Sequence, residues 1–277
     1  MTPIGVFDSG YGGLTILKEL RRLMPGYDYL YLGDNARAPY GTRSFDIVYE
    51  FTLQAVRYLF GHGCPLVILA CNTASAKALR SIQQRDLPSM EDPTRRVLGV
   101  IRPTAEIIGE LSSTGSVGIM GTPGTVSSES YPIEIGKLWP GVKVYSQACP
   151  MWVPLVECHE ASGAGADYFV RKYVDALLGQ SEEIDTIVLA CTHYPILYPK
   201  IREAVAERIK IVRQGEIVAN SLKDYLWRHP EMDTRLSGGG TATFLTTEEP
   251  DKFTDLASLF LESEEPLSVR RVSLEDN

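Results

Sequence analysis

The sequence of 277 residues lacks the patterns that mark several large classes of protein. It has five cysteines, an odd number, and no Cys-x-x-Cys pair, which argues against both a disulfide framework and a zinc knuckle. Its four histidines show neither H-x-x-x-H nor H-E-x-x-H spacing, so the usual helix-borne ligands of a metal are missing. We therefore expect reduced thiols and no metal.

Long runs of charge or of apolar residues are also missing. The net charge is −8, with a pI near 5.2 and no long basic run at either end, which argues against a dedicated binder of nucleic acid or membrane surfaces. No apolar run approaches the roughly 20 residues that span a bilayer, and the N-terminus lacks a basic region followed by an apolar one. The expected location is the cytoplasm.

What the sequence does have is a regular alternation of strand and helix patterns. Helical stripes separate the expected strands, as where Ser44 precedes apolar residues that recur every four positions up to Gly61 or Gly63, and again at 168–178 and 200–208. The expected strands are short, apolar and often β-branched, and they cover residues 4–7, 29–32, 66–70, 97–100, 116–120, 142–145, 186–190 and 209–212. This alternation predicts an α/β protein with mainly parallel sheets and right-handed crossovers.

Two of these strands end in nearly the same way. Cys71 follows the run Pro-Leu-Val-Ile-Leu-Ala, and Cys191 follows Thr-Ile-Val-Leu-Ala. Each cysteine precedes a segment with a helical pattern, at 73–85 and 195–208, so both thiols are expected at the carboxyl end of a buried parallel strand. Open α/β sheets bind their ligands at that edge.

The likeness extends beyond the cysteines and indicates a duplicated unit. The strand that runs into Asp8 resembles the one that runs into Thr122, and the distances to the two cysteines are similar, 71 − 8 = 63 and 191 − 122 = 69 residues. We expect two similar, pseudo-symmetric three-layer domains, 1–100 plus 212–277 and 101–211, with an active site in the cleft between them.

Paired thiols suit the inversion of an amino acid at Cα. That reaction removes a weakly acidic proton from one face and returns one to the other, so two acid/base groups must flank the carbon. A thiol near a helix N-terminus has a lowered pKa, which is the expectation for both Cys71 and Cys191. A single cysteine at a strand end is more often a small buried hydrophobe, and we interpret Cys64, Cys149 and Cys158 in that way.

Groups that suit a zwitterionic substrate surround the two thiols. Asp8 can bind an ammonium group or orient a proton carrier, and His193 can donate a proton or tune the thiol, although turn and cap roles are open for both. Glu157 lies in an apolar stretch, where an unpaired carboxylate is costly, so it should be paired or functional. Hydroxyl and amide donors for carboxylates, each also a possible cap or turn residue, are Ser9, Asn72, Thr73, Thr122, Thr125 and Thr192.

Six motifs in order resemble those of the cofactor-independent aspartate/glutamate racemase family, and of its glutamate racemases in particular. They are FDSGYGGL at 7–14, Asp34 and Asn35 followed by PYG at 39–41, ACNTA at 70–74, GT with GTV at 121–126, VPLVE at 153–157, and ACTHYP at 190–195. The segment FLTT at 244–247 and the helical pattern after it resemble the closing part of the family. The likeness therefore covers nearly the whole chain.

The resemblance implies a function and a role for each matching residue. Cys71 would take the α-proton from D-glutamate with help from Asp8, and Cys191 would take it from L-glutamate with help from Glu157 and His193. Substrate would be bound by Asp8, Ser9, Pro39, Tyr40, Gly41, Asn72, Thr73, Thr122, Thr125, Thr192 and His193. The family uses no pyridoxal phosphate, metal or nucleotide, supplies D-glutamate for peptidoglycan, and commonly forms homodimers.

The chain departs from this pattern at Arg213-Gln214, where many relatives have an acidic residue near the Gly-Glu pair, so the role of that turn is open. Cys158 and His159 add a thiol and an imidazole beside Glu157. Two alternatives to a glutamate racemase remain. One is a racemase or decarboxylase that acts on aspartate or a related acid, and the other is a partner-binding protein with secondary racemase activity.

Overall fold

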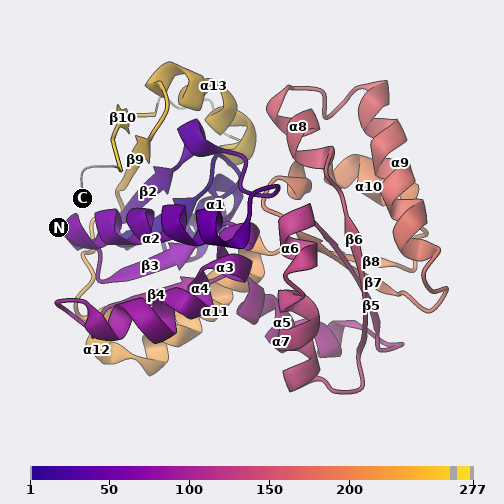
Figure 1. The fold of residues 1–277 in the computed structure, drawn as a ribbon, viewed down its shortest axis with the longest axis horizontal. Helices are drawn as coiled ribbons and strands as arrows, with labels where there is room; N and C mark the ends of the chain where they lie inside the picture. Colours follow the sequence, from indigo (N-terminus) through magenta and orange to yellow (C-terminus); the bar gives the residue numbers. More distant parts are fainter. Residues whose placement is uncertain (1, 263–266, 275–277) are drawn as a thin grey trace.

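The computed structural model describes residues 2–262 and 267–274, whose strands form two separate sheets (Figure 1). The first sheet contains β1 (Ile4–Asp8), β2 (Tyr29–Gly33), β3 (Leu66–Leu69), β4 (Arg96–Gly99), β9 (Ala242–Thr246) and β10 (Val269–Arg271), in the order β10-β9-β2-β1-β3-β4. The second contains β5 (Ser116–Gly121), β6 (Lys143–Ala148), β7 (Thr186–Ala190) and β8 (Lys210–Val212), in the order β6-β5-β7-β8.

The second sheet repeats four strands of the first. The order β2-β1-β3-β4 corresponds to β6-β5-β7-β8, and every pairing between described strands is parallel. Cys71 comes two residues after β3 and Cys191 directly after β7, on strands that pair with β1 and β5 respectively. The predicted α/β class, the parallel sheets and the equivalence of the two cysteine strands are confirmed.

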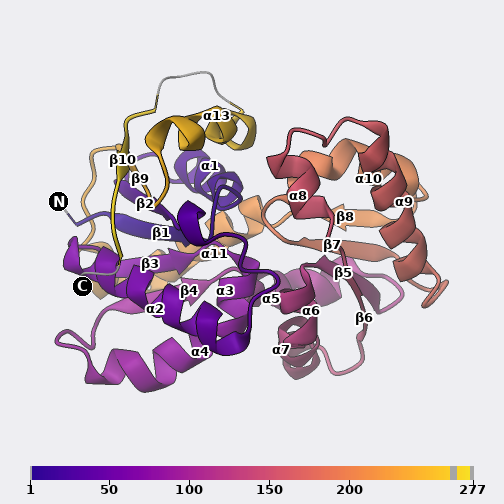
Figure 2. The same ribbon diagram turned by 45° about the horizontal axis from the view of Figure 1, so that its top comes forward.

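Helices cover both faces of each sheet (Figures 1 and 2). On the first sheet, α1 (Leu14–Leu23), α11 (Gly215–Arg228) and α13 (Pro250–Leu261) pack on one face, and α2 (Phe45–Gly61) and α3 (Asn72–Lys77) pack on the other. On the second sheet, α5 (Ile101–Leu111) and α7 (Ser130–Leu138) pack on one face, and α9 (Ala164–Leu178) and α10 (Tyr198–Ala204) pack on the other. The remaining α-helices are α4 (Leu79–Ser81), α6 (Pro123–Ser127), α8 (Trp152–Glu157) and α12 (Pro230–Asp233).

The strand patterns located all eight expected strands to within three residues. Ser44 caps α2 as predicted, because its side chain accepts the backbone N–H of Ile47 at 3.5 Å. The helical pattern expected over 73–85 is confirmed, although an irregularity at Ala78 divides the segment into α3, α4 and a π-helical turn. The helix expected over 200–208 ends at Ala204, where the backbone of Val205 becomes extended. The guanidinium of Arg202 donates to the carbonyls of Val205 and Ile209 beyond it.

The chain passes between the two sheets twice. The first crossover follows β4 at Val100, and the second follows β8 at Arg213-Gln214, after which α11 packs against α1. A strip of buried apolar residues from both halves is continuous across this junction. Among the described residues, no helix has the length and apolar character needed to cross a bilayer.

Asp28 ties the returning C-terminal segment to β2. Its Oδ1 accepts the backbone N–H and the hydroxyl of Thr241 at 3.0 and 2.6 Å, and these hydrogen bonds lower the pKa of the carboxyl to about 2. A carboxyl with a depressed pKa contributes stability that is complete above about pH 4, its unfolded pKa, and is lost as the pH falls through about 2.

We therefore expect Asp28→Ala to lower the free energy of unfolding by about 1–3 kcal/mol at pH 7, since it removes two hydrogen bonds to a buried carboxylate. The deficit relative to the unmodified protein should shrink below about pH 4. Urea unfolding followed by circular dichroism measures both effects. The matched control is Asp224→Ala, which removes an exposed pair with Arg228 and should change stability by less than about 0.5 kcal/mol. Equal losses in the two variants, or a deficit that does not depend on pH, would contradict this account.

Candidate functional site

A small cavity lies where the carboxyl ends of the two sheets meet. Its volume is about 90 Å³, which is enough for several waters or one small metabolite. Both Cys71 and Cys191 line it, one from each sheet. The other lining residues are Ser9, Ala38, Pro39, Tyr40, Gly41, Thr42, Asn72, Thr73, Thr122, Pro123, Cys149, Pro150, Val153, Pro154, Glu157, Thr192 and His193.

Almost all of the residues singled out from the sequence therefore meet in one place. The two that do not line the cavity are Asp8 and Thr125, and both are buried directly behind it. Asp8 interacts electrostatically with the Cys71 thiol, and the Thr125 hydroxyl accepts a hydrogen bond from Thr122 at 3.1 Å. The site residues predicted from the sequence therefore form one cluster.

The Cys71 thiol is buried at the N-terminus of α3. Its sulfur accepts the backbone N–H of Ala74 at 3.4 Å and lies 3.4 Å from the hydroxyl of Ser9. Burial and the neighbouring Asp8 nevertheless raise the pKa of the thiol to about 12, against the smaller effect of these two hydrogen bonds. The expectation that the helix terminus lowers this pKa is therefore wrong for Cys71, because desolvation of the thiolate outweighs the dipole.

Cys191 is paired with an imidazole and a carboxylate. Its sulfur lies 4.0 Å from Nδ1 of His193, whose Nε2 lies 2.9 Å from Oε1 of Glu157. Burial alone would lower the pKa of His193, but the hydrogen bonds to Cys191 and Glu157 and their charges outweigh it and raise the pKa to about 10. Glu157 is indeed paired, as its apolar sequence context predicted.

The two carboxyl oxygens of Asp8 differ in their hydrogen-bond partners. Oδ1 accepts the backbone N–H of Gly10 at 2.8 Å, while Oδ2 is buried and has no hydrogen-bond partner among the described residues. Burial raises the pKa of this carboxyl, although the positive charge on His193 and the backbone donors of Gly10 and Gly13 oppose the shift. The two thiols thus have different neighbours, a carboxyl beside Cys71 and an imidazole beside Cys191.

Hydroxyl groups join the two halves at the cavity wall. Thr73, from the first half, lies 2.9 Å from the hydroxyl of Thr122 on the second. Nearby, the carbonyl of Gly41 accepts the N–H of Gly124 at 2.7 Å, and a Cβ at Gly41 would lie 2.9 Å from that of Thr122. Only glycine permits this approach, so position 41 fixes how closely the halves meet.

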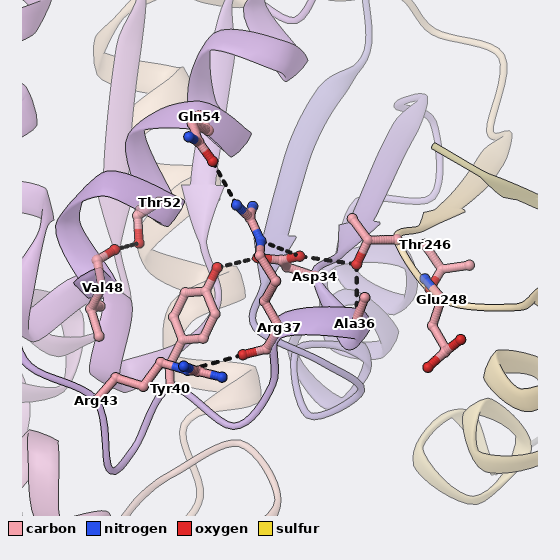
Figure 3. A network of polar contacts seen from close by, with 11 residues as sticks. Asp34, Ala36, Arg37, Tyr40, Arg43, Val48, Thr52, Gln54, Thr246 and Glu248 are labelled. Carbon is pink, nitrogen blue, oxygen red and sulfur yellow. Dashed lines mark hydrogen bonds and ion pairs between the residues drawn. The ribbon is translucent and has the colours of Figure 1, made fainter. Parts of the chain in front are cut away.

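The loop that carries Pro39, Tyr40 and Gly41 is held by a buried carboxylate (Figure 3). Asp34 accepts hydrogen bonds from the Tyr40 hydroxyl and from Nε of Arg37, the latter at 2.7 Å to Oδ2. Thr247, from the segment after β9, donates to the other oxygen at 2.9 Å. The C-terminal segment therefore supports a loop that lines the cavity from the N-terminal part of the chain.

Sequence reasoning missed some residues of the site. Cys149, which we assigned only as a small buried hydrophobe, lines the cavity together with Pro150. Their position directly after β6 could have indicated this, because ligands bind at the carboxyl ends of parallel strands. Cys158 is exposed, which corrects its assignment as a buried hydrophobe. Gln214, whose role the sequence left open, is buried and donates to the hydroxyl of Tyr131 at 2.7 Å behind the cavity.

Comparisons with known proteins agree on one family. Residues 13–222 match the model of the Asp/Glu/Hydantoin racemase family. A curated glutamate racemase of Ruegeria pomeroyi is 40% identical over 93% of this chain and 96% of its own length. Crystal structures of glutamate racemases from Bacillus anthracis and from Francisella tularensis, the latter in complex with D-glutamate, superpose with TM-scores of 0.88 and 0.86 at 33% and 31% identity. These two cover 99% and 100% of this chain and 98% and 99% of their own.

The environment of His193 predicts a charged imidazole at neutral pH. A raised histidine pKa contributes stability that is complete below the unfolded pKa of about 6.5 and is lost as the pH rises through about 10. In NMR titrations of histidine-labelled protein, the resonance that His193→Gln removes should titrate near pH 10. Glu157→Gln should move that midpoint downward, because it removes the negative charge and keeps the amide oxygen as an acceptor. A midpoint near 6.5 in the unmodified protein would contradict the geometry.

Proposed function

Because the chain belongs to the Asp/Glu/Hydantoin racemase family, we propose that it interconverts L-glutamate and D-glutamate, with Cys71 and Cys191 as the two acid/base groups. The observation that carries the proposal is the placement of two thiols in one small cavity, at equivalent strand ends of two similar sheets. A carbon bound between the two sulfurs would have a proton carrier on each face, as inversion requires.

In the proposed reaction of L-glutamate, the Cys191 thiolate accepts the α-proton. The C–H bond breaks, its electron pair remains on Cα, and the Cys71 thiol gives its proton to the opposite face, which forms D-glutamate and leaves a Cys71 thiolate. D-glutamate reacts by the same steps in reverse. The imidazolium of His193, held by Glu157, would stabilise the Cys191 thiolate. Asp8, a buried carboxyl of raised pKa, would hold or move a proton on the Cys71 side.

The substrate carboxylates would be held by neutral donors. In the described part of the chain, the residues that line the cavity include no lysine or arginine. The loop at Pro39, Tyr40 and Gly41 would contribute apolar surface and backbone groups to the substrate site. Thr125 accepts a hydrogen bond from Thr122 and so holds it in place. The side-chain donors that line the cavity are Ser9, Asn72, Thr73, Thr122 and Thr192. Several uncharged donors directed at one anion can bind it without a fixed positive charge.

The proposal also includes a division of the chain into two domains. We assign 1–100 plus 212–277 to a first domain, which carries Cys71, and 101–211 to a second, which carries Cys191; residues 1, 263–266 and 275–277 lie outside the described residues. The separate sheets and the two crossovers support this division. The proposal also includes cytoplasmic location, a homodimer, and supply of D-glutamate for peptidoglycan, without cofactor, nucleic acid or membrane.

The test is to add L-glutamate to the purified protein in D₂O, under reducing conditions and without cofactor. Circular dichroism should decay to zero, and proton NMR should show deuterium at Cα. Activity on aspartate with none on glutamate would assign the protein to the alternative racemase. Absence of α-proton exchange with glutamate, aspartate and related amino acids would reject an amino-acid racemase and favour a partner-binding role.

Each thiol should be required for racemization. We expect Cys71→Ala and Cys191→Ala to reduce turnover at least about 10³-fold, because each removes the proton carrier of one face. Both variants should stay folded, since each loses only one sulfur atom beside an existing cavity. The matched control is Cys64→Ala, which truncates a buried thiol remote from the cavity and should keep turnover near that of the unmodified protein. Turnover near normal in either site variant would rule out the two-thiol mechanism.

A further inference from the structure

One side chain of the cavity wall, Asn72, forms a closed ring of hydrogen bonds with two buried side chains behind it, Tyr131 and Gln214. Asn72 Nδ2 donates to Oε1 of Gln214 at 2.7 Å, Gln214 Nε2 donates to the Tyr131 hydroxyl at 2.7 Å, and that hydroxyl donates to Oδ1 of Asn72 at 2.7 Å. All three residues are at most 3% exposed. They come from three elements that are distant in sequence, namely the start of α3, the residue before α11, and α7.

The ring alone can run in either direction, because reversing both amides and the hydroxyl preserves every bond. Contacts at the first crossover remove this ambiguity. Gln214 Nε2 also lies 3.1 Å from the backbone carbonyl of Val100 and 2.8 Å from the hydroxyl of Thr104. A carbonyl can only accept, so the nitrogen of Gln214 must face it and the oxygen must face Asn72.

The orientation of Gln214 in turn sets that of Asn72. With Oε1 of Gln214 facing it, the Asn72 amide must present its nitrogen to Gln214 and its oxygen to Tyr131. One hydrogen of that nitrogen is used by Gln214, which leaves the second for a ligand in the cavity that Asn72 lines. A reversed Asn72 would place a carbonyl oxygen toward the same ligand and lose both hydrogen bonds.

We propose that Gln214 is a positioning residue that fixes the Asn72 amide with its N–H directed at a carboxylate of the substrate. The inference rests on the proposed racemase function and adds to it a residue outside the cavity lining. It also assigns a role to Gln214, part of the Arg213-Gln214 departure from the family pattern. Substrate recognition on the Cys71 side then depends on a backbone carbonyl at the crossover between the two halves.

The test compares Gln214→Met, which is similar in length but neither donates nor accepts strongly, with the unmodified protein. We expect KM for both enantiomers to rise about tenfold, the factor for one lost hydrogen bond to a charged group, while kcat changes much less. Uniform loss of binding has this signature, because the carboxylate is present in both the ground state and the transition state. Thermal unfolding by circular dichroism checks that the variant is folded at the assay temperature.

A double-mutant cycle separates positioning from general loss of structure. In an Asn72→Ala background, Gln214→Met should leave KM unchanged, because the group that it orients is absent. The control is Tyr29→Phe, which removes a buried hydroxyl that donates to the Met24 carbonyl far from the cavity, and which should lower stability without changing KM. If Gln214→Met does not fold, Gln214→Leu, which also lacks both hydrogen-bonding groups, takes its place in the same cycle.

The outcomes are distinct. An unchanged KM in a folded Gln214→Met, or the same rise in KM with and without Asn72, rejects the positioning role and leaves the racemase function intact. An unmodified protein that does not racemize glutamate rejects the proposed function, and with it this inference. A rise in KM that disappears in the Asn72→Ala background supports the proposal.

Discussion

The close approach of the two halves at Gly41 is the constraint on which the site depends. Its carbonyl accepts the N–H of Gly124, and the neighbouring hydroxyls of Thr73 and Thr122 continue the contact. Parallel strands place all their carboxyl ends at one edge, so two sheets that meet there also bring together whatever follows those strands. Cys71 and Cys191 share a cavity for this reason, although neither belongs to the contact itself.

Much of the fold followed from local patterns because the central strands β1, β2, β3, β5 and β7 are buried along their whole length. Such strands are continuous apolar runs, and the eight that were predicted belong to the four-strand unit that occurs twice. The two missed strands, β9 and β10, extend the first sheet beyond β2. β10 is three residues long with two arginines, so it lacks the apolar run that indicates a strand.

The candidate site was predictable where it lies on strand ends and unpredictable where it depends on packing. The similar sequences before Cys71 and Cys191 indicated the two thiols, and the hydroxyl and amide residues in the adjacent turns indicated their neighbours. The raised pKa of Cys71 was not predictable, because desolvation depends on how completely other elements cover the sulfur. The partners of Gln214 were equally hidden, since they lie 83 residues away at Tyr131 and 142 away at Asn72. No local pattern encodes contacts at that separation.

The unequal neighbours of the two thiols are compatible with a reaction between mirror images. Enantiomers in water have equal free energies, so under the proposed function the ratio kcat/KM must be the same in both directions, whatever groups stand on each side. A carboxyl beside Cys71 and an imidazole beside Cys191 therefore cannot favour one product at equilibrium. Under the proposed function, they would determine which thiol holds the proton in the free protein, and thus which enantiomer meets a site that is ready to react. In the proposed reaction, the similar sheets place one thiol on each face of the substrate Cα, while the different neighbours of the thiols set their protonation in the free protein.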